Sequence, residues 1–116
     1  AKYDGINRAA QLYISRAAEL DKVPDFELAT WAQQAAEAEA WVADNTAATP
    51  MLSQIAAARG ADLDDLRTKA LKKARAYSAL VAHVAGQRQA YVDALNAATD
   101  LAAVDAIAIN YTAPGA

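Results

Sequence analysis

The sequence predicts an all-α fold, an antiparallel helical bundle with one long helix at about 62–98 and shorter helices before and after it. Apolar and small residues recur in steps of three and four, the spacing of one helix face, and no stretch alternates like a half-buried strand. Alanine, a strong helix former, supplies 34 of the 116 residues. Pro24, Pro50 and Gly60 stand where helices would begin or end. Together these observations favour the bundle over a mixed fold.

Length and composition set outer limits. A chain of 116 residues is one domain by size, so we expect a single helical domain over residues 1–116. Without cysteine there is no disulfide or thiolate metal site, and the single His83 argues against structural zinc. The start of the chain lacks a secretory pattern, and the longest apolar run is far shorter than a membrane span. A soluble protein is expected.

The first predicted helix lies before Pro24. Asp4 is placed to cap it, and Ile6, Ala10, Tyr13, Ala17 and Leu20 keep the helical spacing. Arg8 and Arg16 fall outside that stripe and are expected in solvent. Because proline breaks the pattern, residues 1–22 either join the bundle or form a separate helix that docks on a neighbouring subunit.

A second helix is predicted from Asp25 to about Asp44. Its apolar stripe comprises Phe26, Trp31, Ala35, Ala38 and Val42. Glu27, Glu37 and Glu39 lie mostly on the opposite side. Trp31 is expected to be buried against the long helix, and Trp41, beside the stripe, either completes the core or faces a partner.

A short third helix is predicted from Pro50 to Arg59. Thr49 is placed as its N-cap, and Pro50 occupies the first position, where a missing N–H costs nothing. Gly60 suits the left-handed residue that ends a helix. Met51, Leu52 and Ile55 form its apolar face.

The long helix then follows, capped by Asp62, with Asp64 and Asp65 favoured by the helix dipole. At 1.5 Å per residue it is roughly 50 Å long, more than a domain of this size needs. Gly86, inside it, indicates a close helix crossing or a bend. A last short helix is predicted after Asp100, with Leu101, Val104 and Ile107 as its apolar edge, and residues 111–116 are expected to be an irregular tail.

No catalytic, cofactor-binding or metal-binding set is found in the sequence. His83 has no carboxylate three or four residues away, so a structural role is favoured over a ligand or a base. Glu37 and Glu39 point about 200° apart on a helix and form no pair. The aspartates at 62, 64 and 65 lack EF-hand spacing, so capping explains them better. We expect no enzymatic activity, no cofactor and no small-molecule substrate.

DNA binding is the third functional alternative. Residues 53–66 loosely imitate a helix-turn-helix, and bases follow at Arg67, Lys69, Lys72, Lys73 and Arg75. However, the recognition helix would present three aspartates to the phosphates, and the net charge of −3 falls mainly on the first half of the chain. A nucleic acid partner is therefore not favoured.

The central part of the chain resembles a module of tailed-bacteriophage tail proteins, in which a Trp-rich acidic helix precedes a Thr-Pro-Leu turn and an Ala-Ala-Arg-Gly stop. The residues that carry this resemblance are Trp31 to Trp41, Asp44, Thr49 to Leu52, Ala56 to Gly60, Gly86 to Gln89, Thr99, Val104 and Ile107. The resemblance covers roughly residues 26 to 110 and leaves residues 1–24 without a counterpart.

The resemblance implies a non-enzymatic structural or adaptor protein of a phage tail, associated with the tail fibre or baseplate. Such a protein is made in the bacterial host cytoplasm and ends in the virion. Its partners would be copies of itself or other tail proteins, with no membrane. The second alternative is a tail-fibre assembly chaperone that the virion does not retain.

The alanine-rich core predicts that the protein works through contacts with other chains. Each buried alanine contributes little apolar area, so a lone chain would be thinly stabilised. Large side chains with a polar edge suit such contacts. The candidate contact residues are Tyr3, Tyr13, Trp41, Tyr91 and Tyr111.

Overall fold

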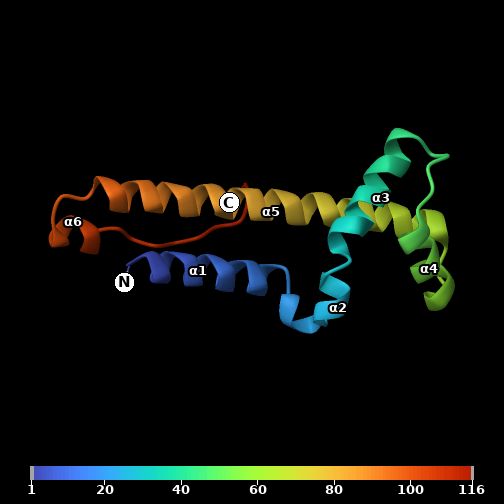
Figure 1. The fold of residues 1–116 in the computed structure, drawn as a ribbon, viewed down its shortest axis with the longest axis horizontal. Helices are drawn as coiled ribbons and strands as arrows, with labels where there is room; N and C mark the ends of the chain where they lie inside the picture. Colours follow the sequence, from blue (N-terminus) through green and yellow to red (C-terminus); the bar gives the residue numbers. More distant parts are fainter. Residues whose placement is uncertain (1, 116) are drawn as a thin grey trace. The chain divides into compact units, whose positions relative to one another are not determined.

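The computed structural model describes residues 2–115 and is all-helical, with no strand among these residues. The predicted fold class is confirmed: shorter helices pack against one long helix, α5 (Leu63–Ala97). The other elements are α1 (Lys2–Ala17), the 3-10 helix η1 (Leu20–Lys22), α2 (Asp25–Leu28), α3 (Trp31–Ala43), α4 (Pro50–Arg59) and α6 (Leu101–Asp105) (Figure 1).

The tertiary contacts fall into two compact units. Among the described residues, unit 1 contains 2–22 and 79–115, and unit 2 contains 23–78. Helix α5 is continuous through both, with residues 63–78 in unit 2 and 79–97 in unit 1. Each unit is described by itself below, and the single domain over 1–116 stays a prediction.

In unit 1, α1 lies antiparallel to the second half of α5 (Figure 1). Arg88 Nε donates to Asn7 Oδ1 over 2.7 Å, and the Tyr3 hydroxyl donates to Asn96 Oδ1, so residue numbers rise along α1 as they fall along α5. Ile6 is fully buried. Helix α1 therefore contributes buried side chains to the core of unit 1, and a separate docking role for residues 1–22 stays a prediction.

Unit 2 contains α2, α3, α4 and the first half of α5. Its buried side chains include Leu52, Ala56 and Ala38, from α4 and α3. The Trp31 ring is half-buried and meets the Tyr77 ring of α5 edge-on, with 5.3 Å between ring centroids. The predicted contact of Trp31 with the long helix is confirmed.

The second predicted helix is interrupted. Residues 25–44 form α2 and α3, separated at Ala29 and Thr30. The Thr30 hydroxyl donates to the Glu27 carbonyl oxygen over 2.7 Å and accepts from Gln34 Nε2, a local bonding pattern that competes with a continuous helix. Phe26 was expected in the core, but its helix ends after one turn and the side chain is 77% exposed.

Several helix ends follow local chemistry as predicted. Asp62 Oδ2 accepts from the amide of Asp65 at the start of α5, and Asp100 Oδ1 accepts from the amide of Ala103 at the start of α6. Gly60 ends α4 with a left-handed φ of 70°. The first helix differs, because α1 already includes Lys2 and Asp4 lies within its first turn.

Candidate protein-contact site

Residues 107–112 form a non-helical segment that runs along α1 and the second half of α5 (Figure 1); we call it the strap. Burial alternates along it: Ile107, Ile109 and Tyr111 are buried or half-buried, whereas Ala108 and Asn110 are exposed. This period of two is typical of an extended chain with one face on its support. Within the predicted tail, residues 111–115 are irregular in backbone as expected, but Tyr111 and Thr112 are bound to α1 and α5.

Side chains of α5 hold the backbone of the strap. The Tyr91 hydroxyl donates to the carbonyl oxygen of Asn110 and accepts from the amide of the same residue, both over 2.8 Å. One turn earlier, Gln87 Nε2 donates to Thr112 Oγ1 over 2.9 Å and Gln87 Oε1 accepts from the Thr112 amide over 3.2 Å. Each of these two side chains therefore makes two hydrogen bonds to one residue of the strap.

His83 extends this row by one more turn. Its Nε2 lies 3.3 Å from Thr112 Oγ1, and the ring is half-buried. His83 therefore contacts the strap, which is consistent with the structural role that the sequence favours.

Helix α1 holds the other side of the strap. Lys2 Nζ donates to the carbonyl oxygen of Ile107 over 3.1 Å, and the Tyr111 hydroxyl donates to the carbonyl oxygen of Ile6 over 3.0 Å. The second bond joins residues 105 positions apart. Two points of the strap are thus tied to the first two turns of α1.

Three tyrosine rings meet where the strap crosses the helices. The Tyr111 centroid lies 5.4 Å from that of Tyr91, with the rings edge to face, and 6.4 Å from that of Tyr13. Tyr111 is 8% exposed and packs with Ala10 and Val84 in the core of unit 1. The pKa of the Tyr111 hydroxyl is raised, mainly because the hydroxyl is buried and to a lesser extent because Tyr91 lies beside it.

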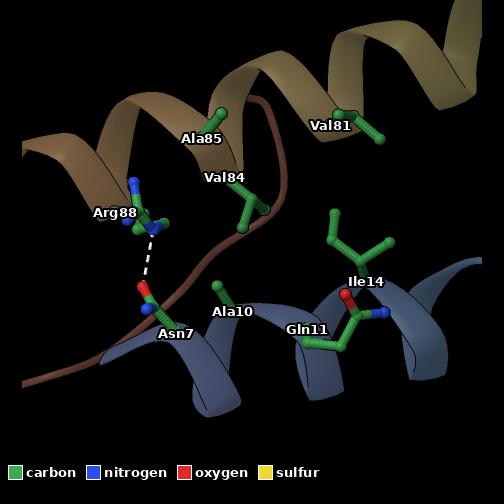
Figure 2. A pocket seen from close by; sticks show the side chains of 8 residues that line it. All are labelled: Asn7, Ala10, Gln11, Ile14, Val81, Val84, Ala85 and Arg88. Atoms are coloured by element: carbon green, nitrogen blue, oxygen red, sulfur yellow. Dashed lines mark hydrogen bonds between the residues drawn. The ribbon is translucent and has the colours of Figure 1, made fainter. Parts of the chain in front are cut away.

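Beside this core, α1 and α5 enclose an open hollow of about 310 Å³ (Figure 2). Apolar side chains form its floor, and Figure 2 shows Ala10 and Val84 directed toward one another, with Ile14 and Val81 further along. The hydrogen bond from Arg88 to Asn7 closes one end. Arg88 is therefore a polar link between the two helices.

The five predicted contact residues have different surroundings. Tyr3 is 45% exposed, whereas Tyr13, Tyr91 and Trp41 are half-buried. Tyr111 lies in the core of unit 1, and its role in contacts with other chains stays a prediction. Tyr13, Tyr91 and Tyr111 are brought together in unit 1, and Trp41 lies in unit 2.

In unit 2, Glu37 joins α3 to the start of α4. Its carboxylate accepts from the amides of Met51 and Leu52, each over 3.0 Å, and from Gln33 Nε2 over 3.1 Å. The side chain is 8% exposed, so the expectation that Glu37 faces solvent is wrong. Burial raises the pKa of this carboxyl, but the hydrogen bonds from Leu52, Gln33 and Met51 outweigh it and the net pKa is lowered.

Thr49 has a different role from the predicted cap. It occupies the N-cap position of α4 but makes no side-chain cap bond, because Glu37 takes those amides. Its buried hydroxyl instead accepts from Arg67 Nε of α5 over 2.9 Å. The Arg67 guanidinium lies over the Trp41 ring, 5.5 Å from the centroid, which places Trp41 in a cation–π contact.

Three of the six basic residues of α5 form ion pairs with carboxylates. Arg67 pairs with Asp64 at 2.9 Å, Lys69 with Asp65 at 3.0 Å, and Arg75 with Glu39 at 2.7 Å. The last pair also fixes α3 to α5 through two hydrogen bonds. These pairs reduce the positive charge that this part of α5 offers to an anion.

Sequence reasoning missed the strap and the most exposed large apolar residues. The alternation of Ile107, Ile109 and Tyr111 is the signal that could have indicated an extended, one-sided segment. Phe26 and Leu101 are 77% and 74% exposed, although helical spacing placed both on apolar faces. No local signal separates them from core residues, because their helices are too short for periodicity to be informative.

Neither a metal-binding cluster nor a membrane-spanning helix is found within residues 2–115. No group of three or more His, Asp and Glu side chains in this range is arranged to hold a metal ion. None of the described helices combines the length and hydropathy needed to cross a bilayer.

Comparison with known proteins gives a similarity over part of the chain. Residues 72–109 match a family model described as the HI1402 helical domain. The match covers most of α5 and all of α6, together with the first residues of the strap. Neither a curated protein nor a solved structure matches the chain.

Proposed function

We propose that the chain is a non-enzymatic structural or adaptor protein of a bacteriophage tail, associated with the tail fibre or baseplate and acting through protein contacts. The proposal starts from the resemblance of residues 26 to 110 to a tail-protein module. Its partners are copies of the chain or other tail proteins, and its site of action is the virion.

One observation carries the proposal: residues of the resembling motif are those that join the helices of unit 2. Trp31 contacts α5, Trp41 stacks on Arg67, and Thr49 accepts from Arg67. Within the same block, Glu37 binds the start of α4 and Gly60 ends that helix. A motif whose members depend on one another in space supports a shared structural module better than chance similarity between alanine-rich helices.

Exposed apolar side chains support a role in protein contacts. The large apolar side chains that are more than one third exposed are Tyr3, Leu12, Phe26, Val42, Val81 and Leu101. Aromatic anchors such as Tyr supply much of the binding energy where proteins meet, and apolar side chains add area that is removed from water. Phe26 and Leu101, the two most exposed, are added to the five candidate contact residues.

Mass spectrometry of purified phage particles tests the proposal. A structural protein is expected in particles in a stoichiometric amount relative to known tail components. Presence in the infected-cell lysate but absence from particles would favour the assembly chaperone. A salt-dependent shift of DNA by the purified protein would favour the DNA-binding alternative.

A further inference from the structure

The strap site of unit 1 has the character of a peptide-binding groove. Its donors and acceptors on α5 are the side chains of Tyr91 and Gln87, and both bind backbone atoms of the strap. On α1, Lys2 and the Ile6 carbonyl oxygen add two further bonds. Every chain carries both the groove and the strap, so each copy can bind the strap of any other copy.

The connection between the groove and the strap is weakly packed. Residues 98–106 include α6, which has no buried residue, and Leu101 there is 74% exposed. The hydrogen bonds found for these described residues are local, such as those from Val104 to Asp100 and from Ala106 to Ala102. No fully buried side chain within residues 98–106 therefore fixes the direction in which the chain leaves α5 and enters the strap.

Release of the strap would uncover Val84 and part of the Tyr91 ring, both packed in the core that contains Tyr111. Exposing this surface is unfavourable, and only a segment with the same alternation of apolar side chains restores the original contacts. An equivalent strap from a second copy restores all of them without any new contact.

We propose that the groove between α1 and α5 is an interaction site for the strap of a second copy of this chain, and that copies associate by exchanging residues 107–112. Anchoring comes from Tyr111, with Ile107 and Ile109 on the same face. Backbone recognition comes from Tyr91 and Gln87. This proposal goes beyond the proposed function and does not depend on it, since strap exchange requires only copies of the chain.

Cysteine cross-linking tests the exchange, because the chain has no cysteine of its own. Two single variants, Gln87→Cys and Thr112→Cys, are mixed, incubated under conditions that permit local opening, and treated with a short bismaleimide. Exchange predicts a covalent 1:1 dimer of the two variants, with a yield that rises with protein concentration. A matched mixture of Lys73→Cys and Thr112→Cys controls for random collision, since Lys73 is an exposed residue of unit 2.

The double variant Gln87→Cys/Thr112→Cys supplies the second measurement. Its cross-link within one chain reports that groove and strap still meet in the variants. Efficient cross-linking within the double variant, together with a mixed-dimer yield no higher than the Lys73 control, would overturn the proposal and leave the strap as a contact within one chain. Failure of the double variant to cross-link would also overturn it, because the groove would then not hold the strap.

A binding measurement tests the proposal without the cysteine variants, in case these lose stability. The full-length Tyr111→Ala chain, whose strap lacks its anchor, is titrated with a fluorescent peptide of residues 106–114. Saturable binding is expected, with at least tenfold weaker binding of the same peptide carrying Tyr111→Ala. Equal binding of the two peptides would contradict anchoring by Tyr111 and, with it, exchange of the strap. Either result is independent of whether the protein is found in phage particles.

Discussion

Glu37 Oε1 accepts a hydrogen bond from the backbone amide of Leu52 over 3.0 Å, and this contact joins the middle of α3 to the first turn of α4. The amides at a helix start have no partner within the helix, and a carboxylate there also favours the helix dipole. Because Leu52 is fully buried, the same residue provides both the capped amide and a core side chain. One carboxylate therefore caps the start of α4 and links this helix to α3.

Removal of this carboxylate is expected to destabilise unit 2. Glu37→Ala should lower the free energy of unfolding by about 2–3 kcal/mol, because two charge-assisted bonds are lost and buried amides stay unpaired. Urea unfolding followed by tryptophan fluorescence measures the change. Glu39→Ala, which removes an exposed carboxylate two residues away, is the matched control and should change stability far less. Equal effects of the two substitutions would contradict the capping role.

The same carboxylate predicts acid sensitivity. The pKa of Glu37 in the folded protein lies below its usual value of 4.5, so ionisation stabilises the fold. This contribution is complete above the unfolded-state pKa and is lost as the pH falls through the lower, folded-state pKa. Urea unfolding midpoints measured from neutral pH down to pH 3 should therefore begin to decrease once the pH is below about 4.5. Glu37→Gln should make the midpoint depend less on pH in this range. An unchanged profile in that variant would assign the acid sensitivity to other carboxyl groups.

The edge-to-face pair of Trp31 and Tyr77 predicts a large effect in unit 2. Trp31→Ala should cost about 3 kcal/mol, the lower end of the range for aromatic truncation, since the ring is only half-buried. Thermal unfolding by circular dichroism provides the measurement. Trp31→Phe keeps a ring toward Tyr77 and should retain most of the stability. Wild-type melting of Trp31→Ala would mean that this contact contributes little.

Burial of Ile6 predicts that α1 stabilises unit 1. Ile6→Ala should cost about 2–4 kcal/mol, because the side chain is fully buried and leaves a cavity. Hydrogen exchange should then increase in α1, in residues 107–112 and in the second half of α5. Leu12→Ala, at a position 45% exposed on the same helix, is the control and should have a small effect. Unchanged exchange in Ile6→Ala would show that α1 is dispensable for unit 1.

Gly86 predicts a stabilising substitution. Apart from the backbone of its own helix and its chain neighbours, no atom lies within 4 Å of the position that a Cβ would occupy, so of the two alternatives a close helix crossing is not found within residues 2–115. Gly86→Ala should raise the free energy of unfolding by about 0.5–1 kcal/mol through helix propensity. Chemical unfolding of the purified protein measures this gain. A loss of stability that grows with protein concentration would instead indicate that another chain packs at Gly86.

The helical class and most helix ends follow from the sequence alone, because these features depend on neighbouring residues. Asp62 and Asp100 cap amides three positions away, and Gly60 takes the left-handed conformation at the end of its own helix. The long helix, predicted at 62–98, is found at Leu63–Ala97. Its periodicity extends over many turns, so local pattern and tertiary packing agree.

The roles of Glu37, Phe26 and Tyr111 depend on contacts between segments that lie far apart in the sequence or on the end of a short helix. The side of α3 that carries Glu37 becomes buried because the start of α4 approaches it, and the sequence near Glu37 does not encode that approach. Phe26 is left in solvent because its one-turn helix ends before a stripe can form. Tyr111 belongs to a segment that is neither helix nor strand. Hydrogen bonds to groups 19 to 105 positions away in the sequence hold this segment in place. Such long-range contacts depend on the folded chain, so no periodicity within residues 107–112 could specify their partners.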